Sequence, residues 1–308
     1  MRFLHRGVPL AAAAFALAGL APPADACSIC RCGDPTFNAL GKDVVAAAGW
    51  RFALDWERFS KTQGASDQQD SVVERRYTGV LAYTFADRLL LVARIPYSKH
   101  SLDETAGDAV ERTETSGLAD PELYAQVRLW SSPFAGDLGR RASISATFGV
   151  KTDWGVNDAS RDGERLDEHA QPGTGSTDAF FGFSGYYLID RKSSFFASVQ
   201  ARLPGSNDFG YRYGRIYLAN LAYERKLATK LDSVLELNYR HAGRDEIDAT
   251  GVLDGDTGGS MVYLTPRLLV EVGGGVVLRG AVQIPLVENL NGVQDEKAVY
   301  NLGVTYSF

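Results

Sequence analysis

The stretch Tyr300-Asn301-Leu302-Gly303-Val304-Thr305-Tyr306-Ser307-Phe308 decides the fold class. Large apolar side chains occupy every second position, and small or polar residues lie between them. Successive side chains of a β-strand point to opposite faces, so this stretch predicts a strand with one apolar and one polar face. The same period-two pattern recurs in short segments back to about residue 47, which indicates an all-β chain.

The polar faces of these segments carry full charges in mid-strand. In one segment Leu235 and Leu237 alternate with Glu236 and Arg240. A soluble protein core does not accept such charges, whereas a barrel with lipid outside and a polar interior does. Aromatic residues near the ends of the segments fit the interfacial girdles of such a barrel: Trp50, Trp56, Tyr97, Trp130, Tyr211 and Tyr213. The pattern therefore predicts a transmembrane antiparallel up-and-down β-barrel.

About twelve strands are expected. They cover residues 47–60, 72–85, 88–98, 118–130, 142–154, 177–189, 194–203, 211–225, 231–242, 259–272, 276–286 and 298–308. Short turns alternate with longer polar connections, including 99–117, 155–176 and 243–258. This alternation is typical of bacterial outer-membrane barrels, with the short turns and both termini on the periplasmic side.

The N-terminus has the features of a cleaved signal peptide. A basic start precedes an apolar stretch over residues 8–21, and Ala24-Asp25-Ala26 provides small residues at the cleavage site. We therefore expect a signal peptide at 1–26, a periplasmic cysteine-containing segment at 27–46 and an outer-membrane barrel at 47–308. No later apolar run is long enough for a membrane-spanning helix. The net charge of −6 argues against nucleic acid as a partner.

The charged residues of the polar faces are the candidate lumen-lining residues. Both signs occur in similar numbers, so ion pairs between them would either close the barrel or leave a narrow, weakly selective channel. These two alternatives stay open. The candidates are Arg51, Asp55, Arg94, Glu122, Arg128, Arg202, Glu236, Arg240, Arg267, Glu271 and Arg279.

All three cysteines lie in one short segment: Cys27, Cys30 and Cys32. A disulfide is one interpretation, with one cysteine left over. The second is binding of copper or zinc by the thiolates. The third is contact with a periplasmic electron-transfer protein, for which Cys-x-x-Cys has the right spacing. The fourth is lipidation of Cys27. Covalent haem is disfavoured because Arg31 stands where a c-type site needs histidine.

An outer-membrane hydrolase is the enzymatic alternative. It would need a nucleophile beside a histidine on the lipid-facing side. The candidate histidines are His100, His169 and His241. The first two lie in or beside long connections, and no serine lies near the third in the sequence. We therefore predict that the protein is not an enzyme.

With the strands placed, several phrases resemble outer-membrane proteins of the "MetA-pathway of phenol degradation" transporter family. These are Gly117-Leu118-Ala119-Asp120-Pro121, Gly173-Thr174-Gly175-Ser176, Val282-Gln283-Ile284-Pro285-Leu286 and the closing Leu302–Phe308. The resemblance covers roughly residues 72–308. It implies a barrel that passes or senses small, often hydrophobic, molecules. It carries over no binding residue, and the cysteine segment lies outside the family pattern.

The expected function is an outer-membrane channel or transporter for small solutes, with the cysteine segment on the periplasmic side. The alternative is a closed structural or sensory barrel whose cysteine segment binds copper or docks a periplasmic redox partner. The expected partners are outer-membrane lipid, the barrel-assembly machinery through Phe308, and a periplasmic metal or electron-transfer protein.

Overall fold

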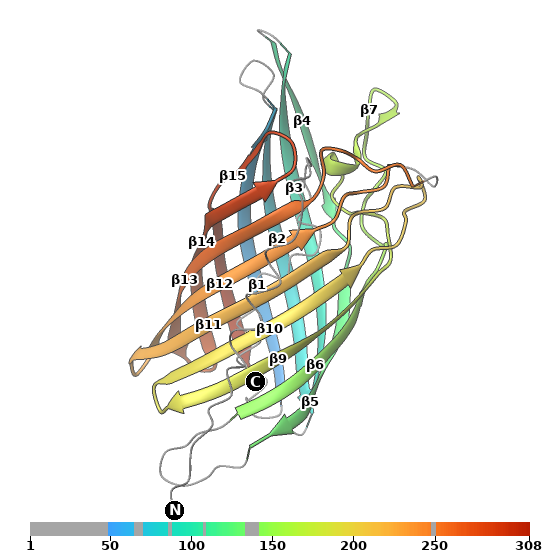
Figure 1. The fold of residues 1–308 in the computed structure, drawn as a ribbon. Helices are drawn as coiled ribbons and strands as arrows, with labels where there is room; N and C mark the ends of the chain where they lie inside the picture. Colours follow the sequence, from blue (N-terminus) through green and yellow to red (C-terminus); the bar gives the residue numbers. More distant parts are fainter. Residues whose placement is uncertain (1–48, 65–69, 86–87, 107–108, 133–141, 248–250) are drawn as a thin grey trace, which may run out of the picture.

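The computed structural model describes residues 49–64, 70–85, 88–106, 109–132, 142–247 and 251–308. Fourteen strands form one antiparallel sheet that closes on itself, because β1 pairs with both β2 and β16. Figure 1 shows the resulting tilted barrel. Its strands are β1 (Gly49–Gln63), β2 (Asp70–Phe85), β3 (Leu89–Ala106), β4 (Ala109–Leu118), β5 (Glu122–Ser131), β6 (Ala142–Lys151), β9 (Asp178–Asp190), β10 (Ser193–Leu203), β11 (Ile216–Ala228), β12 (Leu231–Ala242), β13 (Gly259–Gly273), β14 (Val276–Leu290), β15 (Gln294–Glu296) and β16 (Val299–Ser307).

The fourteen strands make twelve positions in the barrel wall. Strands β4 and β5 both pair with β3, one after the other, and β15 and β16 both pair with β1 in the same way. Each of these pairs is therefore one wall strand with a short break. The predicted closed barrel of about twelve strands is confirmed.

Small elements lie in the connection between β6 and β9. They are β7 (Ser160–Arg161), β8 (Glu164–Arg165) and the short 3-10 helix η2 (Glu168–Ala170). No helix within the described residues is long and apolar enough to cross a membrane.

Burial alternates along the strands as the sequence pattern predicts. On β12 the side chains of Val234, Glu236 and Asn238 are buried, whereas Leu235 and Leu237 are exposed. The outer surface of the barrel is therefore mainly apolar, and the interior contains most of the charged side chains. A lone hydrophobic residue on a protein surface needs no explanation, but a continuous apolar surface indicates contact with lipid or another protein.

The two ends of the barrel differ. The backbone N–H groups of Trp50 and Phe308 each donate to the other residue's carbonyl, at 3.1 and 3.0 Å, so both ends of the described barrel meet. The short connections between β9 and β10, β11 and β12, and β13 and β14 lie at this same end, which we call the turn end. The opposite end carries the long connections and is called the loop end (Figure 1).

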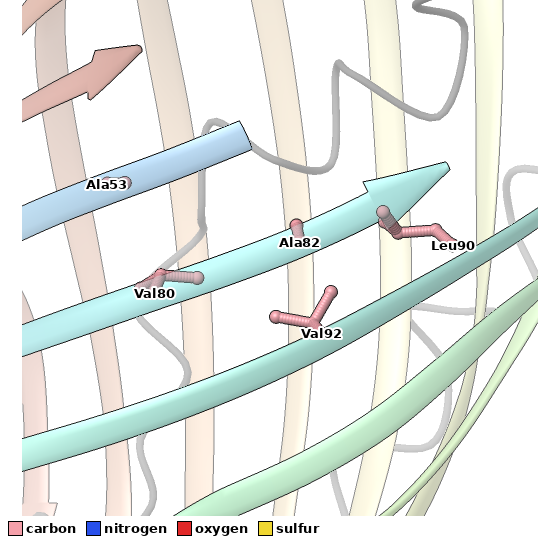
Figure 2. Close-up of a cluster of buried hydrophobic side chains, with 5 residues drawn as sticks. All are labelled: Ala53, Val80, Ala82, Leu90 and Val92. Carbon is pink, nitrogen blue, oxygen red and sulfur yellow. The ribbon is translucent and has the colours of Figure 1, made fainter. Parts of the chain in front are cut away.

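Part of the interior near the turn end is apolar. Ala53 on β1, Val80 and Ala82 on β2, and Leu90 and Val92 on β3 form one buried cluster (Figure 2). These apolar side chains come from three adjacent strands. The removal of their surface from water stabilises the closed sheet. A second buried cluster joins strands β11, β12 and β13.

The structure corrects two of the predicted connections. Residues 99–117 do not form an open loop, because β3 and β4 continue as a hairpin paired from Tyr97↔Leu118 to Ala106↔Ala109. Exposed cross-strand ion pairs, such as Asp103 with Arg112, stabilise this polar hairpin. Residues 211–215 precede β11 instead of starting it. Tyr211 and Tyr213 are therefore not girdle residues but are buried in a loop.

Two leucines of similar exposure test whether the outer surface contacts lipid. Leu302 on β16 is 58% exposed, and Leu253 at the loop end is 52% exposed. In phospholipid vesicles, Leu302→Arg should lower the free energy of unfolding by about 2–4 kcal/mol, because a lipid-facing cation is costly. Leu253→Arg should change it by no more than about 0.5 kcal/mol. Denaturant unfolding measures both, and equal small costs would contradict a lipid-facing wall.

Candidate functional site

Six charged side chains form a continuous chain of alternating sign along the inner wall between β3 and β10. The ends of the chain are Arg94 on β3 and Asp120, which lies between β4 and β5. The links are Arg94–Glu122 at 2.7 Å, Glu122–Arg202 at 2.6 Å, Arg202–Asp178 at 4.0 Å, Asp178–Lys151 at 3.4 Å and Lys151–Asp120 at 2.9 Å. Three cations balance three carboxylates, so the chain is neutral overall.

The link between Glu122 and Arg202 braces the wall. Glu122 is on β5 and Arg202 is on β10, with β6 and β9 between them in the sheet. The Arg202 side chain is 1% exposed and reaches across both strands. Glu122 accepts from both Arg94 and Arg202. Burying a charge is costly unless it is paired and hydrogen-bonded. Removing any one of these three side chains would therefore leave a buried charge with fewer partners.

Asp120 also holds the connection between β6 and β9, residues 152–177. One carboxylate oxygen accepts from the backbone N–H of Gly155 at 2.9 Å. The other accepts from the backbone N–H and the hydroxyl of Thr174, at 2.7 and 2.6 Å. Lys151 donates to the same oxygen and to the Ser176 carbonyl. Asp120 therefore joins the charge chain to both ends of this connection.

Pro121 explains why Asp120 is available for this role. Proline has no backbone N–H, and it restricts the residue before it, so it interrupts the pairing with β3 at the break between β4 and β5. Asp120 then lies outside the strands, with a side chain only 2% exposed. The two phrases that carry the family resemblance, 117–121 and 173–176, are thus in direct contact through Asp120 and Thr174.

The connection 152–177 packs against the loop-end part of the wall. A Cβ on Gly117 would come within 2.9 Å of Val156, so the glycine allows the connection to approach β4. The hydroxyl of Thr115 on β4 donates to the Ala170 carbonyl at 2.5 Å. On the other side, Asn207 donates to the Thr174 carbonyl. A cavity of about 30 Å³ lies between this connection and the wall, with Arg94, Asp120 and Thr174 among its lining.

The other side of the barrel carries separate ion pairs. Arg267 on β13 binds Glu236 on β12 at 2.7 Å, and Arg279 on β14 binds Asp55 on β1. Arg240 on β12 binds Glu296 on β15 at 2.5 Å. Tyr263 donates to this same Glu296 carboxylate. The Arg267–Glu236 pair joins neighbouring strands. The Arg279–Asp55 and Arg240–Glu296 pairs join strands that are not neighbours in the sheet.

A row of uncharged polar groups lies on the inner faces of four successive strands. Thr265 donates to the Asn238 side chain at 2.6 Å, Asn238 donates to Asn220 at 2.9 Å, and Asn220 donates to Ser198 at 3.1 Å. Amides and hydroxyls both donate and accept, so they form a continuous row without charge. The sequence reasoning missed this row because it considered only charged residues.

Most candidate lumen-lining residues have inward, buried or half-buried side chains. Arg94, Glu122 and Arg202 belong to the charge chain, and Asp55, Glu236, Arg240, Arg267 and Arg279 form the ion pairs of the other side. Arg51 donates to Thr84 at 2.7 Å, and Arg128 is half-buried on β5. Glu271 is exposed, because it lies beside the turn that ends β13. Their role in conduction stays a prediction.

The sequence reasoning missed Asp120, Lys151, Asp178 and Glu296. Lys151 and Asp178 lie on the inward faces of β6 and β9, within the predicted strands 142–154 and 177–189, so the period-two pattern could have found them. Asp120 falls within the predicted strand 118–130 but lies between β4 and β5 in the structure, so alternation could not give its contacts with the connection 152–177. Glu296 is on a strand of three residues, which is too short to show alternation.

A second polar cluster lies at the loop end, around Asp245. The Tyr211 hydroxyl donates to its carboxylate at 2.7 Å, and the backbone N–H of Gly214 donates at 2.6 Å. The ring of His169 lies 3.2 Å from the Tyr211 hydroxyl. Tyr213 donates to the carbonyl of Glu168. Burial raises the pKa of Asp245, although the nearby His169 and the hydrogen bond from Tyr211 act in the opposite direction.

The predicted signal peptide and the whole predicted segment 27–46, with its three cysteines, lie outside the described residues. Within the part of the chain that the structure describes, no group of three or more histidine, cysteine, aspartate and glutamate side chains could hold a metal ion. The four interpretations of Cys27, Cys30 and Cys32 therefore stay predictions.

No protein-family model and no curated protein matches the sequence. Membership of the phenol-degradation family consequently stays an expectation. Among solved structures, the chain is similar to the COG4313 outer membrane channel from Pseudomonas putida F1. The TM-score is 0.65 and the identity 15%, over 85% of this chain and 96% of that one. This similarity shows that the fold is that of an outer-membrane barrel.

Two further similarities are more distant. One is to the translocator domain of the autotransporter NalP from Neisseria meningitidis, with a TM-score of 0.49 and 13% identity over 87% of this chain and 92% of that one. The other is to the Ralstonia pickettii toluene transporter TbuX, with a TM-score of 0.43 and 10% identity over 86% and 91%.

Removing the Asp120 carboxylate should destabilise the protein strongly. Asp120→Ala removes one of the two carboxylates that pair with the buried Lys151. The loss of this partner should lower the free energy of unfolding by roughly 3–5 kcal/mol. It should also free the connection 152–177, so that trypsin cleaves after Arg161 or Arg165. The control is Asp103→Ala, which breaks an exposed pair with Arg112 and should have little effect. Equal protease resistance of both variants would contradict the anchoring role.

The loop-end cluster should loosen as the pH rises. A raised carboxyl pKa means that the folded state holds the proton more tightly, so its contribution is complete below about pH 4 and is lost through the raised pKa. Hydrogen exchange of residues 243–247 and 251–258 from pH 4 to 8 should therefore accelerate more in wild type than in Asp245→Asn, after correction for the intrinsic rate. Asp256→Asn, in the same loop, should behave as wild type. If the exchange rates of Asp245→Asn and wild type changed identically with pH, the titration of Asp245 would not control this cluster.

Proposed function

We propose that the protein is an outer-membrane channel for small solutes whose conductance is limited by the connection 152–177. The closed barrel has the fold of an outer-membrane channel. The observation that carries the proposal is the Asp120 anchor. This anchor holds a loop-end connection against a polar inner wall instead of leaving it in solvent. The similarity of the fold to the COG4313 outer membrane channel supports a transport role.

The proposed orientation places the loop end outside the cell and the turn end in the periplasm. Long connections on the outside and short turns on the inside are the usual arrangement in bacterial barrels. Both ends of the barrel, near Trp50 and Phe308, would then be periplasmic. The cysteine segment would lie at the periplasmic mouth, and Phe308 would be available to the barrel-assembly machinery.

The charges of the interior favour weak ion selectivity. The charge chain contains three cations and three carboxylates, and the ion pairs of the other side are also balanced. A ring of one sign would select ions of the opposite sign, whereas balanced pairs have only a small net field. We expect similar permeability for K⁺ and Cl⁻.

The alternative proposal is a closed barrel whose function depends on the cysteine segment. The observation that favours it is the complete burial of several interior charges: Glu236 is 0% exposed and Arg202 is 1% exposed. A barrel filled by paired side chains would not conduct. Copper or zinc binding, or docking of a periplasmic electron-transfer protein, by Cys27, Cys30 and Cys32 would then be the activity.

Planar-bilayer conductance of the refolded mature protein separates these proposals. Wild type should show steady single-channel steps, and Asp120→Ala/Lys151→Ala should show larger ones, because the double change frees the connection without leaving an unpaired buried charge. The matched control is Asp103→Ala/Arg112→Ala on the exposed hairpin, which should conduct as wild type.

The cysteines are tested in the same measurement. Replacing Cys27, Cys30 and Cys32 by serine should leave the conductance unchanged if the barrel is the channel. Absence of conductance in both wild type and Asp120→Ala/Lys151→Ala would refute the channel. Stoichiometric Cu(I) binding that is lost in the serine variant would then support the alternative.

A further inference from the structure

Three cations lie side by side on the outer surface of the barrel. Arg58 on β1 pairs with Arg75 on β2, and Arg75 pairs with Lys99 on β3. All three are on the outward face, and Arg75 and Lys99 are exposed. Side chains opposite each other on neighbouring strands have Cβ atoms about 5 Å apart, and like charges in such positions destabilise the sheet.

No carboxylate offsets this row, which we call the cation row. Within the described residues, none of its three side chains makes an ion pair or a side-chain hydrogen bond. The one carboxylate beside it is Glu114, which is diagonal to Lys99 on β4. The outward residues next to Arg58 and Arg75 along their strands are aromatic, aliphatic or hydroxylated. The row therefore has an excess of positive charge that an external anion would balance.

The cation row lies next to an aromatic row. Trp56, Tyr77 and Tyr97 pair with one another one step closer to the turn end. Aromatic rings of outer-membrane barrels lie at the level where hydrocarbon meets headgroups. Arginine and lysine just beyond them are therefore at headgroup level. The planar guanidinium of arginine can bind two oxygens of one phosphate, so phosphate is the anion that this row fits best.

An apolar groove of about 890 Å³ begins at the end of this row, beside Trp56 and Arg58. It crosses the outer surface of β16, β14, β13 and β12, with Leu302, Leu268 and Leu235 among its lining. Gly280 faces outward between two of these leucines and leaves the groove open. The groove approaches the turn end, because Arg58 is the tenth residue of β1 whereas Ser233 is the third residue of β12, and both strands start there.

We propose that the cation row and the groove bind one phosphorylated glycolipid of the lipid A class. Its phosphate lies between Arg58, Arg75 and Lys99, and one acyl chain lies in the groove below Arg58. The proposal rests on the outer-membrane placement and orientation given above, because lipid A is the anionic lipid of the outward leaflet. Charge complementarity for the headgroup and an apolar groove that starts at the same arginine together define one amphiphilic ligand.

The test is native mass spectrometry of the refolded barrel in nonionic detergent, titrated with lipid A. Wild type should retain one lipid A. Arg58→Gln/Arg75→Gln/Lys99→Gln should bind it about tenfold more weakly or worse, since each basic residue adds to the affinity for an anionic headgroup. The matched control is Lys226→Gln/Lys230→Gln, which removes exposed lysines at the turn end and should bind as wild type.

The groove has its own variant. A side chain at position 280 has room, since the nearest atom to its Cβ is Leu302 Cδ2 at 3.7 Å. Gly280→Leu should fill the groove and weaken lipid A binding without any change of charge. Unchanged affinity in Gly280→Leu would overturn the acyl-chain position.

Titration with other ligands tests whether the site recognises lipid A as a whole or only a phosphate group. Equal binding of phosphatidylglycerol or of dephosphorylated lipid A would overturn the proposal, as would displacement of lipid A by inorganic phosphate. Equal lipid A binding by the triple glutamine variant would also overturn it. Failure of the lipid A proposal can be distinguished from failure of the channel proposal, because lipid A binding in detergent does not require conduction. A barrel that binds lipid A and does not conduct would refute only the channel.

Discussion

A closed, hydrogen-bonded sheet has only two faces, and the rest of the structure depends on this constraint. Each backbone group of the wall pairs with a neighbouring strand, and each side chain must point either outward or inward. The outer face is apolar, so the charges of the strands lie mainly inside. Once inside and away from water, they must find partners. The alternating chain from Arg94 to Asp120 and the pairs of the opposite side satisfy that requirement.

These ion pairs do more than neutralise charge. Glu122 with Arg202, and Arg240 with Glu296, connect strands that are not neighbours in the sheet, so they brace the barrel across its interior. Asp120 extends the brace to the connection 152–177. The same carboxylate thus contributes to stability and holds the connection 152–177 against the wall.

The outer surface is also organised along the barrel axis. Trp50 and Phe308 lie at the turn end, and Trp56, Tyr77 and Tyr97 form a row on the way to the loop end. Arg58, Arg75 and Lys99 follow immediately beyond that row. Such an order of apolar, aromatic and cationic residues matches the change from hydrocarbon to headgroup in a membrane.

The period-two pattern by itself determined the class of fold, the approximate number of strands and the inward direction of residues such as Glu122, Glu236 and Arg267. This was possible because alternation is a local property of each strand. Which charge pairs with which was decided only by the tertiary structure. Glu122 and Arg202 are 80 residues apart, and their contact depends on register and on barrel closure. The burial of Tyr211 and Tyr213 and the four contacts of Asp120 likewise depend on how connections fold over the loop end, where no periodicity constrains the chain.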